Sequence, residues 1–408
     1  MKCVNVSVMH DFTASPPLSL YIHFPWCVRK CPYCDFNSHA LVHDSMPGDE
    51  YIDALIRDLE FELPRIWGRR VTSIFLGGGT PNLFSVDAIG RLLSILRSHL
   101  NLTPGCEITL EANPGAVEAA HFRDYRNTGV NRLSLGVQTF ADPVLGRLGR
   151  IHNGEQAIFA IELARQAGFD NINLDIMYGL PGQSVDDAIQ DLEIAAGFNT
   201  SHLSWYQLTI EPNTVFYSEP PALPEEDSIW SMQDEGVRYL GEHGLRQYEV
   251  SAYARDDHFC VHNMNYWQFG DYLGIGAGAH GKITDCDKGM IHRFARHRIP
   301  ESYMQLSGKP DVIVSEKQLS VQDTILEFMM NAMRLNDGAP VELFTLHTGL
   351  SIETAEEKLQ QAKEKALLDF NTIQIKPTEQ GRRYLNDLLQ IFMDEELIYS
   401  AVKRNYDQ

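Results

Sequence analysis

The chain of 408 residues lacks any run approaching the roughly 20 apolar residues that a membrane-spanning helix needs. Its first 18 residues, MKCVNVSVMHDFTASPPL, hold one lysine and no apolar core segment, so we expect no signal peptide. Basic residues are also few: 34 Lys and Arg stand against 55 Asp and Glu, which gives a net charge of −21. This balance argues against non-specific nucleic-acid binding and against electrostatic attraction to an anionic membrane.

The cysteines are too few and too unevenly spaced for a disulfide scaffold. Three of the seven stand together as Cys27, Cys31 and Cys34, and the other four form no second pair. A structural zinc site usually needs four ligands, so zinc and incidental thiols are the weaker alternatives. Three thiolates at this short spacing can hold three irons of a [4Fe-4S] cluster and leave the fourth iron open to a ligand. Unpaired thiols and an oxygen-sensitive cluster both indicate a reducing cytoplasm.

Strand-like and helix-like segments alternate between residues 19 and 208, which indicates βαβ units and a parallel sheet. The predicted strands are 20–24, 71–76, 107–111, 132–137, 172–176 and 203–208. In a β/α barrel the active site is built at the carboxyl ends of the strands. The glycine or polar residues found there are Tyr21 with the cysteine loop, Gly77-Gly78-Gly79-Thr80, Glu111, Gln138, Asp175, and Gln207 with Thr209. The fold class that we predict is therefore α/β, a partial (β/α)6 barrel.

The composition divides the chain into five parts. We expect a flexible tail at 1–18, the barrel at 19–215, a barrel extension at 216–308, a helical domain at 309–395 and a tail at 396–408. The extension holds a strand-like segment at 247–253. In the helical domain, helices are predicted at 321–333, 340–348, 352–365 and 379–393, with a hairpin at 367–376. This order is typical of a winged helix, but the acidic balance favours a lid or packing module over DNA binding.

The cysteine spacing, with Tyr33 just before the last cysteine, resembles the radical S-adenosylmethionine (SAM) superfamily. The wider string YIHFPWCVRKCPYCDF is similar to the branch that holds oxygen-independent coproporphyrinogen III oxidase (HemN) and the HemW heme chaperones. The resemblance covers about residues 19–395 and implies a [4Fe-4S] cluster on the three cysteines, with SAM as a cofactor. The SAM contacts that it implies are Tyr21, Tyr33, Gly78, Gly79, Thr80, Glu111, Gln138, Arg150 and Asp175. The planar fork of Arg150 suits the SAM carboxylate.

The string HNMNYW at 262–267 packs an imidazole, two amides and two aromatic rings into six residues. By itself it fits a capped strand with a satisfied histidine. It also suits a flat apolar ring, with His262 as an iron ligand and the aromatic side chains covering one face. HNxxYW is similar to a heme-associated motif of the HemW branch, which implies heme as a further ligand. The glycine-rich stretch ending at His280 and Gly281 recurs in this group, and we expect it to line the barrel mouth.

Two departures separate the chain from HemN. The HemN loop carries a fourth cysteine two positions after the third, where this chain has Phe36, and HemN has a longer segment before the cluster. Together with HNMNYW, these departures imply a heme chaperone that delivers heme to apo-proteins such as respiratory cytochromes. The alternatives are an oxygen-independent coproporphyrinogen III oxidase or another radical SAM enzyme acting on a flat macrocycle. The resemblance is also compatible with a homodimer and with membrane association through partner proteins.

Overall fold

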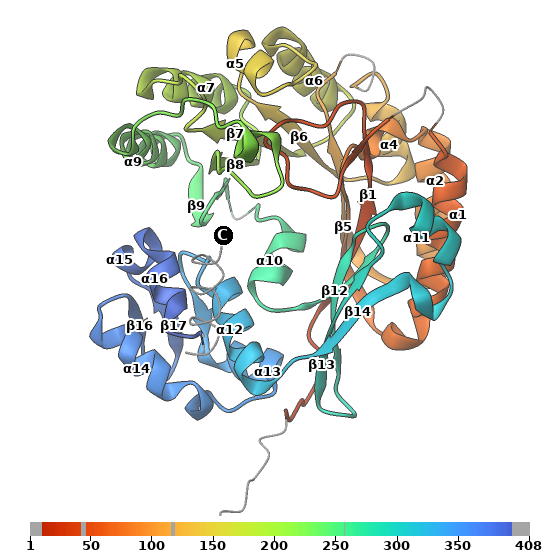
Figure 1. The fold of residues 1–408 in the computed structure, drawn as a ribbon, viewed down its shortest axis with the longest axis vertical. Coiled ribbons are helices and arrows are strands. Elements are labelled where there is room, and N and C mark those ends of the chain that lie inside the picture. Colours follow the sequence, from red (N-terminus) through yellow and green to blue (C-terminus); the bar gives the residue numbers. More distant parts are fainter. Residues whose placement is uncertain (1–9, 42–45, 116–118, 257, 394–408) are drawn as a thin grey trace, which may run out of the picture.

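The computed structural model describes residues 10–41, 46–115, 119–256 and 258–393. These residues form one large curved sheet, helices that cover its outer side, and a smaller domain near the C-terminus (Figure 1). The strand order of the large sheet is β14-β13-β12-β11-β1-β4-β5-β6-β7-β8-β10-β9. This architecture confirms the predicted α/β fold class.

The centre of the sheet is parallel and contains all six predicted strands. They are β1 (Leu18–Phe24), β4 (Arg70–Gly78), β5 (Asn101–Ala112), β6 (Arg132–Gln138), β7 (Asn171–Tyr178) and β8 (His202–Gln207). A seventh parallel strand, β11 (Asp271–Ile275), pairs with the outer edge of β1. Six of the seven residues of β1 are buried, because both faces of this strand are covered.

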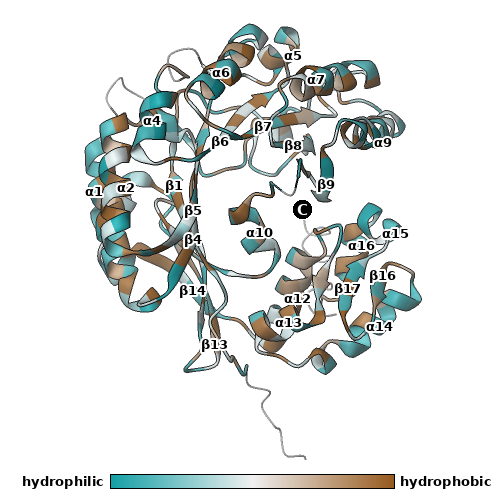
Figure 2. Ribbon diagram, turned by 180° about the vertical axis from the view of Figure 1, so that it is seen from behind, coloured by the Kyte–Doolittle hydropathy of each residue, from teal (hydrophilic) through white to brown (hydrophobic). Residues whose placement is uncertain are grey.

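The connecting helices are amphipathic and pack their apolar sides on the sheet. They are α1 (Gly48–Glu62), α2 (Val86–His99), α4 (Phe122–Thr128), α5 (Asp142–Arg147), α6 (Gly154–Gln166), α7 (Val185–Gly197) and α9 (Glu226–Glu242). In α2 the buried residues recur at helical spacing, as Ala88, Ile89, Leu92, Leu93 and Leu96. Figure 2 shows both hydrophilic and hydrophobic residues on each of these outer helices. Among the described residues, no helix has the length and apolar character needed to cross a bilayer.

The region after the barrel differs from the sequence prediction in two places. The strand predicted at 247–253 is broken into β9 (Arg246–Glu249) and β10 (Ala252–Ala254), which pair antiparallel around Val250 and Ser251. The HNMNYW string forms a short helix, α10 (Val261–Trp267), rather than a capped strand. This helix lies on the concave side of the curved sheet (Figure 1).

Antiparallel strands β12 (His280–Asp285), β13 (Met290–Arg296) and β14 (Ile313–Gln318) continue the sheet beyond β11. The C-terminal domain follows with α12 (Val321–Ala332), α13 (Val341–Thr348), α14 (Glu356–Glu364), and the hairpin β16 (Leu368–Phe370) and β17 (Gln374–Pro377). The predicted helix at 379–393 is interrupted at Tyr384 and gives α15 (Glu379–Arg383) and α16 (Leu385–Gln390). Strand β15 (Ala339–Pro340) completes a three-stranded sheet with the hairpin.

The N-terminal segment before β1 is packed on the C-terminal domain from residue 10 onward. His10 Nδ1 lies 2.7 Å from the carbonyl oxygen of Thr348, and Asp11 N donates to Gly349 O at 2.7 Å. The sequence predicted a flexible tail over 1–18, and this part of it makes specific contacts. Residues 1–9 of that tail and the predicted tail at 396–408 lie outside the described residues.

Candidate functional site

The three clustered cysteines lie on a loop that leaves the carboxyl end of β1. Strands β2 (Trp26–Cys27) and β3 (His39–Ala40) pair and close this loop, and Cys34 N donates to Cys31 O at 3.1 Å inside it. The three thiols line one cavity of about 340 Å³, which we call the thiol cavity. Burial raises the pKa of the Cys27 and Cys34 thiols, so cluster binding would release protons from them.

The glycine-rich loop at the end of β4 contacts the start of the cysteine loop through backbone hydrogen bonds. Gly79 N donates to Phe24 O at 2.6 Å, and Thr80 N donates to Trp26 O at 2.8 Å. A Cβ atom on Gly79 would lie 2.5 Å from the Trp26 carbonyl oxygen, so only glycine fits this approach. Gly78, Gly79 and Thr80 also line the thiol cavity.

Arg150 reaches the same cavity and is held by neutral acceptors. Its Nη2 donates to Asn113 Oδ1 and to Gly136 O, each at 2.7 Å, and its Nη1 lies 3.7 Å from Cys31 Sγ. Asn113 also donates to Thr80 Oγ1 at 2.9 Å, which connects Arg150 with the glycine-rich loop. The Arg150 Nε is buried without a hydrogen-bond partner among the described residues. This cation is therefore positioned beside the thiols, with no carboxylate partner in the part of the chain that the structure describes, and it can bind an anionic ligand.

Two carboxylates and an amide also line the thiol cavity. Glu111 Oε2 accepts from Gly78 N at 3.0 Å, and burial together with Asp175 raises the pKa of Glu111 to about 8. Asp175 accepts from Ser134 at 3.0 Å and from Asn173 at 2.9 Å, while burial raises its pKa. Gln138 accepts from Tyr206 OH at 2.9 Å and has a φ of 70°, which is unusual for a residue other than glycine.

A second and larger cavity of about 660 Å³, the aromatic cavity, adjoins the first. Its apolar lining comes from Tyr21, Phe75, Tyr266 and Tyr272, together with His262. Glu111, Asp175, Asn263 and Trp267 line both cavities, so the two spaces share a wall. Phe36, which is 59% exposed, also borders both of them.

His262 is the most buried of the three histidines that line the aromatic cavity, the others being His23 and His280. It is 3% exposed, its Nδ1 lies 3.1 Å from Ser73 Oγ, and its Nε2 has no hydrogen-bond partner among the described residues. Its ring centroid lies 4.9 Å from that of Phe75 and 5.1 Å from that of Tyr266. Burial, assisted by Arg132, lowers the pKa of His262 to about 3. The imidazole is therefore neutral at physiological pH, which is the form that ligates iron.

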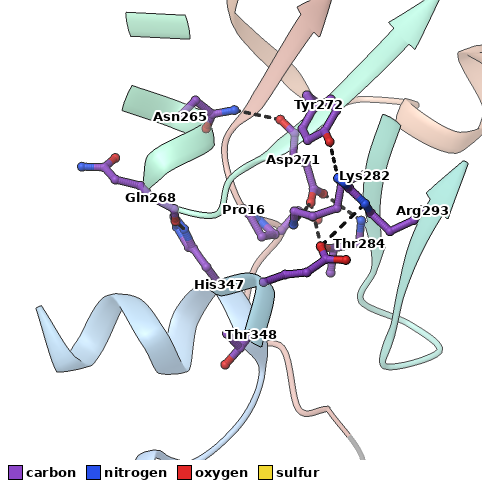
Figure 3. Close-up of polar contacts among 12 residues, drawn as sticks. Pro16, Asn265, Gln268, Asp271, Tyr272, Lys282, Thr284, Arg293, His347 and Thr348 are labelled. Atoms are coloured by element: carbon purple, nitrogen blue, oxygen red, sulfur yellow. Dashed lines mark hydrogen bonds and ion pairs between the residues drawn. The ribbon is translucent and has the colours of Figure 1, made fainter. Parts of the chain in front are cut away.

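Polar contacts hold the carboxyl-terminal half of helix α10, the helix that carries His262 (Figure 3). Asn265 Nδ2 donates to Asp271 O at 2.8 Å, and His347 Nδ1 of the C-terminal domain lies 2.6 Å from Gln268 O. The guanidinium of Arg334, at the end of α12, lies 4.3 Å from the centre of the Trp267 ring and pairs with Glu249 at 3.1 Å. Both the barrel and the C-terminal domain thus hold this helix in place.

Comparison with known proteins agrees with this geometry. Residues 21–195 match the model of the radical SAM superfamily, and residues 319–384 match that of the HemN C-terminal domain. A relative from Escherichia coli K12, named heme chaperone HemW, is 48% identical over 380 residues, which cover 93% of this chain and 99% of the relative. A Haemophilus influenzae relative of the same name is 46% identical over 385 residues, with the same shares of both chains. The chain belongs to the HemW family.

The solved structure of E. coli coproporphyrinogen III oxidase (HemN), described there as a radical SAM enzyme, is similar in fold to this HemW-family chain. Its TM-score is 0.78 at 24% identity, and the match covers 93% of this chain and 90% of that one. Membership of the radical SAM superfamily implies SAM and an iron–sulfur cluster as cofactors. Among the described residues, no His, Cys, Asp or Glu side chains converge on a point where one metal ion would bind. A cluster binds each thiolate at a different iron, so its thiols need not converge in that way.

In this HemW-family chain the predicted site residues come together in the two cavities. The thiol cavity holds the three cysteines with Tyr33, Gly78, Gly79, Thr80, Glu111, Gln138, Arg150 and Asp175, and the aromatic cavity holds Tyr21 and His262. The expectation that Gln207 and Thr209 lie in the site at the strand ends is wrong, because both are exposed and neither lines the thiol cavity or the aromatic cavity. Ser204 and Tyr206 of β8 face inward instead. The two-residue period of a strand, counted from buried Leu203 and Trp205, could have identified them.

Sequence reasoning also missed Asn113 and Arg132. Asn113 follows β5 directly and was assigned no role from the sequence, yet it connects Arg150 with Thr80. Arg132 begins β6 and lines the aromatic cavity. Its position at the amino end of a strand gave no signal, because barrel sites are expected at the opposite end.

Proposed function

We propose that this protein is a heme chaperone with a radical SAM core, which binds heme and delivers it to apo-proteins such as respiratory cytochromes. The observation that carries the proposal is the unpartnered Nε2 of His262 in a cavity walled by aromatic rings. A flat apolar macrocycle suits such walls, and a neutral imidazole suits its iron. The name of the relatives that are 46–48% identical supports the same function.

The thiol cavity provides what a cluster and SAM require. Cys27, Cys31 and Cys34 would hold the [4Fe-4S] cluster, which supplies one electron for cleavage of the SAM sulfonium bond when both are bound. Arg150 would neutralise the SAM carboxylate, and the backbone at Gly78, Gly79 and Thr80 would lie against its amino acid part. The remaining SAM contacts that we propose are Tyr21, Tyr33, Glu111, Gln138 and Asp175. Because Asn263 and Trp267 line both cavities, SAM bound in this way would lie beside the proposed heme site.

The second candidate is oxygen-independent coproporphyrinogen III oxidase. The observation that favours it is the contact between the two cavities, since a macrocycle in one would lie beside SAM in the other. Phe36 distinguishes the two candidate functions, because it stands where the oxidase pattern has a fourth cysteine.

We further propose a cytoplasmic location, the division into barrel, extension and C-terminal domain given above, and a homodimer that associates with membranes through its partners.

The test is anaerobic and uses the reconstituted full-length protein. Heme is titrated into the wild type, His262→Ala and the control His297→Ala, whose ring contacts Asp311 O outside both cavities. We expect stoichiometric heme binding by the wild type and the control, and loss of at least about tenfold in affinity for His262→Ala, because the iron ligand is removed. Coproporphyrinogen III is supplied with SAM and a reductant in parallel. Protoporphyrinogen formation with weak heme binding would establish the oxidase, and an unchanged affinity of His262→Ala would exclude this ligand.

A further inference from the structure

Arg132 is a buried cation that faces the aromatic cavity from its inner end. It begins β6 and Gln138 ends that strand, so the Cα atom of Arg132 lies about 20 Å along the strand from the end that carries the cysteine loop. Its side chain is 3% exposed, and it lines the same cavity as His262. Its Nε is buried and has no hydrogen-bond partner among the described residues.

The nearest carboxylate, that of Glu107, meets Arg132 only at long ion-pair distance. Glu107 Oε2 lies 3.9 Å from Arg132 Nε, beyond hydrogen-bond distance, while Glu107 Oε1 accepts from His262 N at 3.1 Å and contacts Cys260 Sγ at 3.7 Å. Asp175 is held by Ser134 and Asn173. A buried guanidinium is stabilised when a carboxylate meets its planar fork in two parallel hydrogen bonds, and Arg132 has no such partner within residues 10–41, 46–115, 119–256 and 258–393.

We propose that Arg132 binds a ligand carboxylate, namely a propionate of the porphyrin, at the inner end of the aromatic cavity. The inference rests on the proposed function, because it takes heme as the ligand of that cavity. It also gives the macrocycle a direction. The edge with the propionates enters first and meets Arg132, while the apolar edge lies toward the mouth, where His280 and the exposed Arg298 stand. The opposite orientation would pair the propionates with Arg298.

The two orientations are separated by comparing heme with heme dimethyl ester, in which the propionate charges are blocked. Both ligands are titrated into the reconstituted wild type, Arg132→Met and Arg298→Met, and Arg132→Lys tests whether a charge alone restores binding. We expect the wild type to bind the ester about 10- to 100-fold more weakly than heme, since a charge-assisted hydrogen bond is lost. Arg132→Met should bind both ligands with equal affinity, Arg132→Lys should recover part of the difference, and Arg298→Met should behave as the wild type.

Several outcomes would overturn the inference alone. These are a wild type that binds heme and its ester equally, an Arg132→Met variant that keeps the difference, and an Arg298→Met variant that loses it. If Arg132→Met does not fold, the wild type and Arg298→Met still test the inference. The wild type shows whether the protein distinguishes heme from its ester, and Arg298→Met shows whether that difference depends on Arg298 at the mouth of the cavity. A wild type that binds neither ligand would overturn the proposed function, and this inference with it.

Discussion

The buried carboxyl group of Glu111, in the wall of both cavities, makes the stability of the folded protein depend on pH. Burial and the neighbouring Asp175 raise its pKa to about 8, so the folded protein holds a proton that the unfolded chain releases near pH 4.5. The folded state therefore binds more protons between these two values, and its stability falls as the pH rises through that window. This contribution is complete only at low pH, opposite to that of an ion-paired carboxylate.

Replacement of Glu111 by Gln should remove this pH dependence. We expect the melting temperature of the apo-protein to decrease between pH 5 and pH 8 less steeply in Glu111→Gln than in the wild type. At pH 8 the variant should be the more stable of the two, because no charge has to be buried. Thermal unfolding followed by circular dichroism measures this, with the exposed Glu193→Gln as the matched control. Parallel pH curves for wild type and Glu111→Gln would contradict the expectation.

Among the elements, α10 depends on the C-terminal domain for its position. Its carboxyl end is followed by Gln268, whose carbonyl oxygen meets His347 of α13, and its Trp267 ring packs under Arg334. The helix has only seven residues, so its own hydrogen bonds cannot stabilise it in isolation. The geometry of the proposed heme site is thus set in part by residues more than 65 positions further along the chain.

Loss of the His347 contact should therefore make local opening of α10 more frequent. We expect amide exchange at residues 264–268 to be about 5- to 30-fold faster in His347→Ala, since the partly buried carbonyl of Gln268 loses a hydrogen bond worth about 1–2 kcal/mol. Hydrogen exchange with peptide-level mass spectrometry measures the effect. The control is Thr354→Ala, which removes a hydroxyl contact to Ser351 O on an exposed turn of the same domain. Unchanged exchange in α10 would mean that the barrel alone holds this helix.

The elements also show how far the sequence determines the fold and the site. The six barrel strands were predictable because each is an apolar run bounded by turn residues, and the cysteine and glycine loops followed from their positions after β1 and β4. The place of β11 was not predictable, because its partner β1 lies about 250 residues earlier. The helical form of HNMNYW was hidden too, since its buried face comes only from His262 and Asn265, which contact residues of β4 and β11.

Across the whole molecule, Asp271 connects parts of the chain that are distant in sequence. Its carboxylate is fully buried and accepts from Lys282, Arg69 and Thr284 at 2.8 Å, and Arg69 also donates to Pro16 O (Figure 3 shows the Lys282 and Thr284 contacts). Burial alone would raise its pKa, but Lys282 and Arg69 outweigh burial and hold the pKa of Asp271 below its ordinary value. The N-terminal segment, the sheet and the loop after α10 all meet at this group.

Asp271→Asn should destabilise the whole protein by about 3–5 kcal/mol, because it leaves Lys282 and Arg69 buried without their counter-charge. Urea unfolding at pH 7 measures this loss. The control is Asp53→Asn, which removes an exposed carboxylate that pairs with Arg91 at the surface. It should change the free energy of unfolding by no more than about 1 kcal/mol. Since the pKa of Asp271 is lowered, its contribution is present above the ordinary carboxyl pKa and is lost as the pH falls through the folded value. The difference in the free energy of unfolding between the wild type and Asp271→Asn should therefore become smaller below about pH 4. A difference that stays constant with pH would contradict this role of Asp271.

The pairing of β1 with β11 has a consequence for the order of events during synthesis. The strand that leads into the cysteine loop is flanked on one side by Asp271–Ile275, and the loop itself is held by Asn37 contacts to the carbonyl oxygens of Ala277 and Arg298. A ribosome adding about 5–20 residues per second needs roughly 15–50 s to proceed from the cysteines to residue 298. During that interval the nascent chain carries its thiols outside their finished cradle. Insertion of the proposed cluster into the mature geometry would therefore be a late step, which follows translation of the barrel rather than accompanying it.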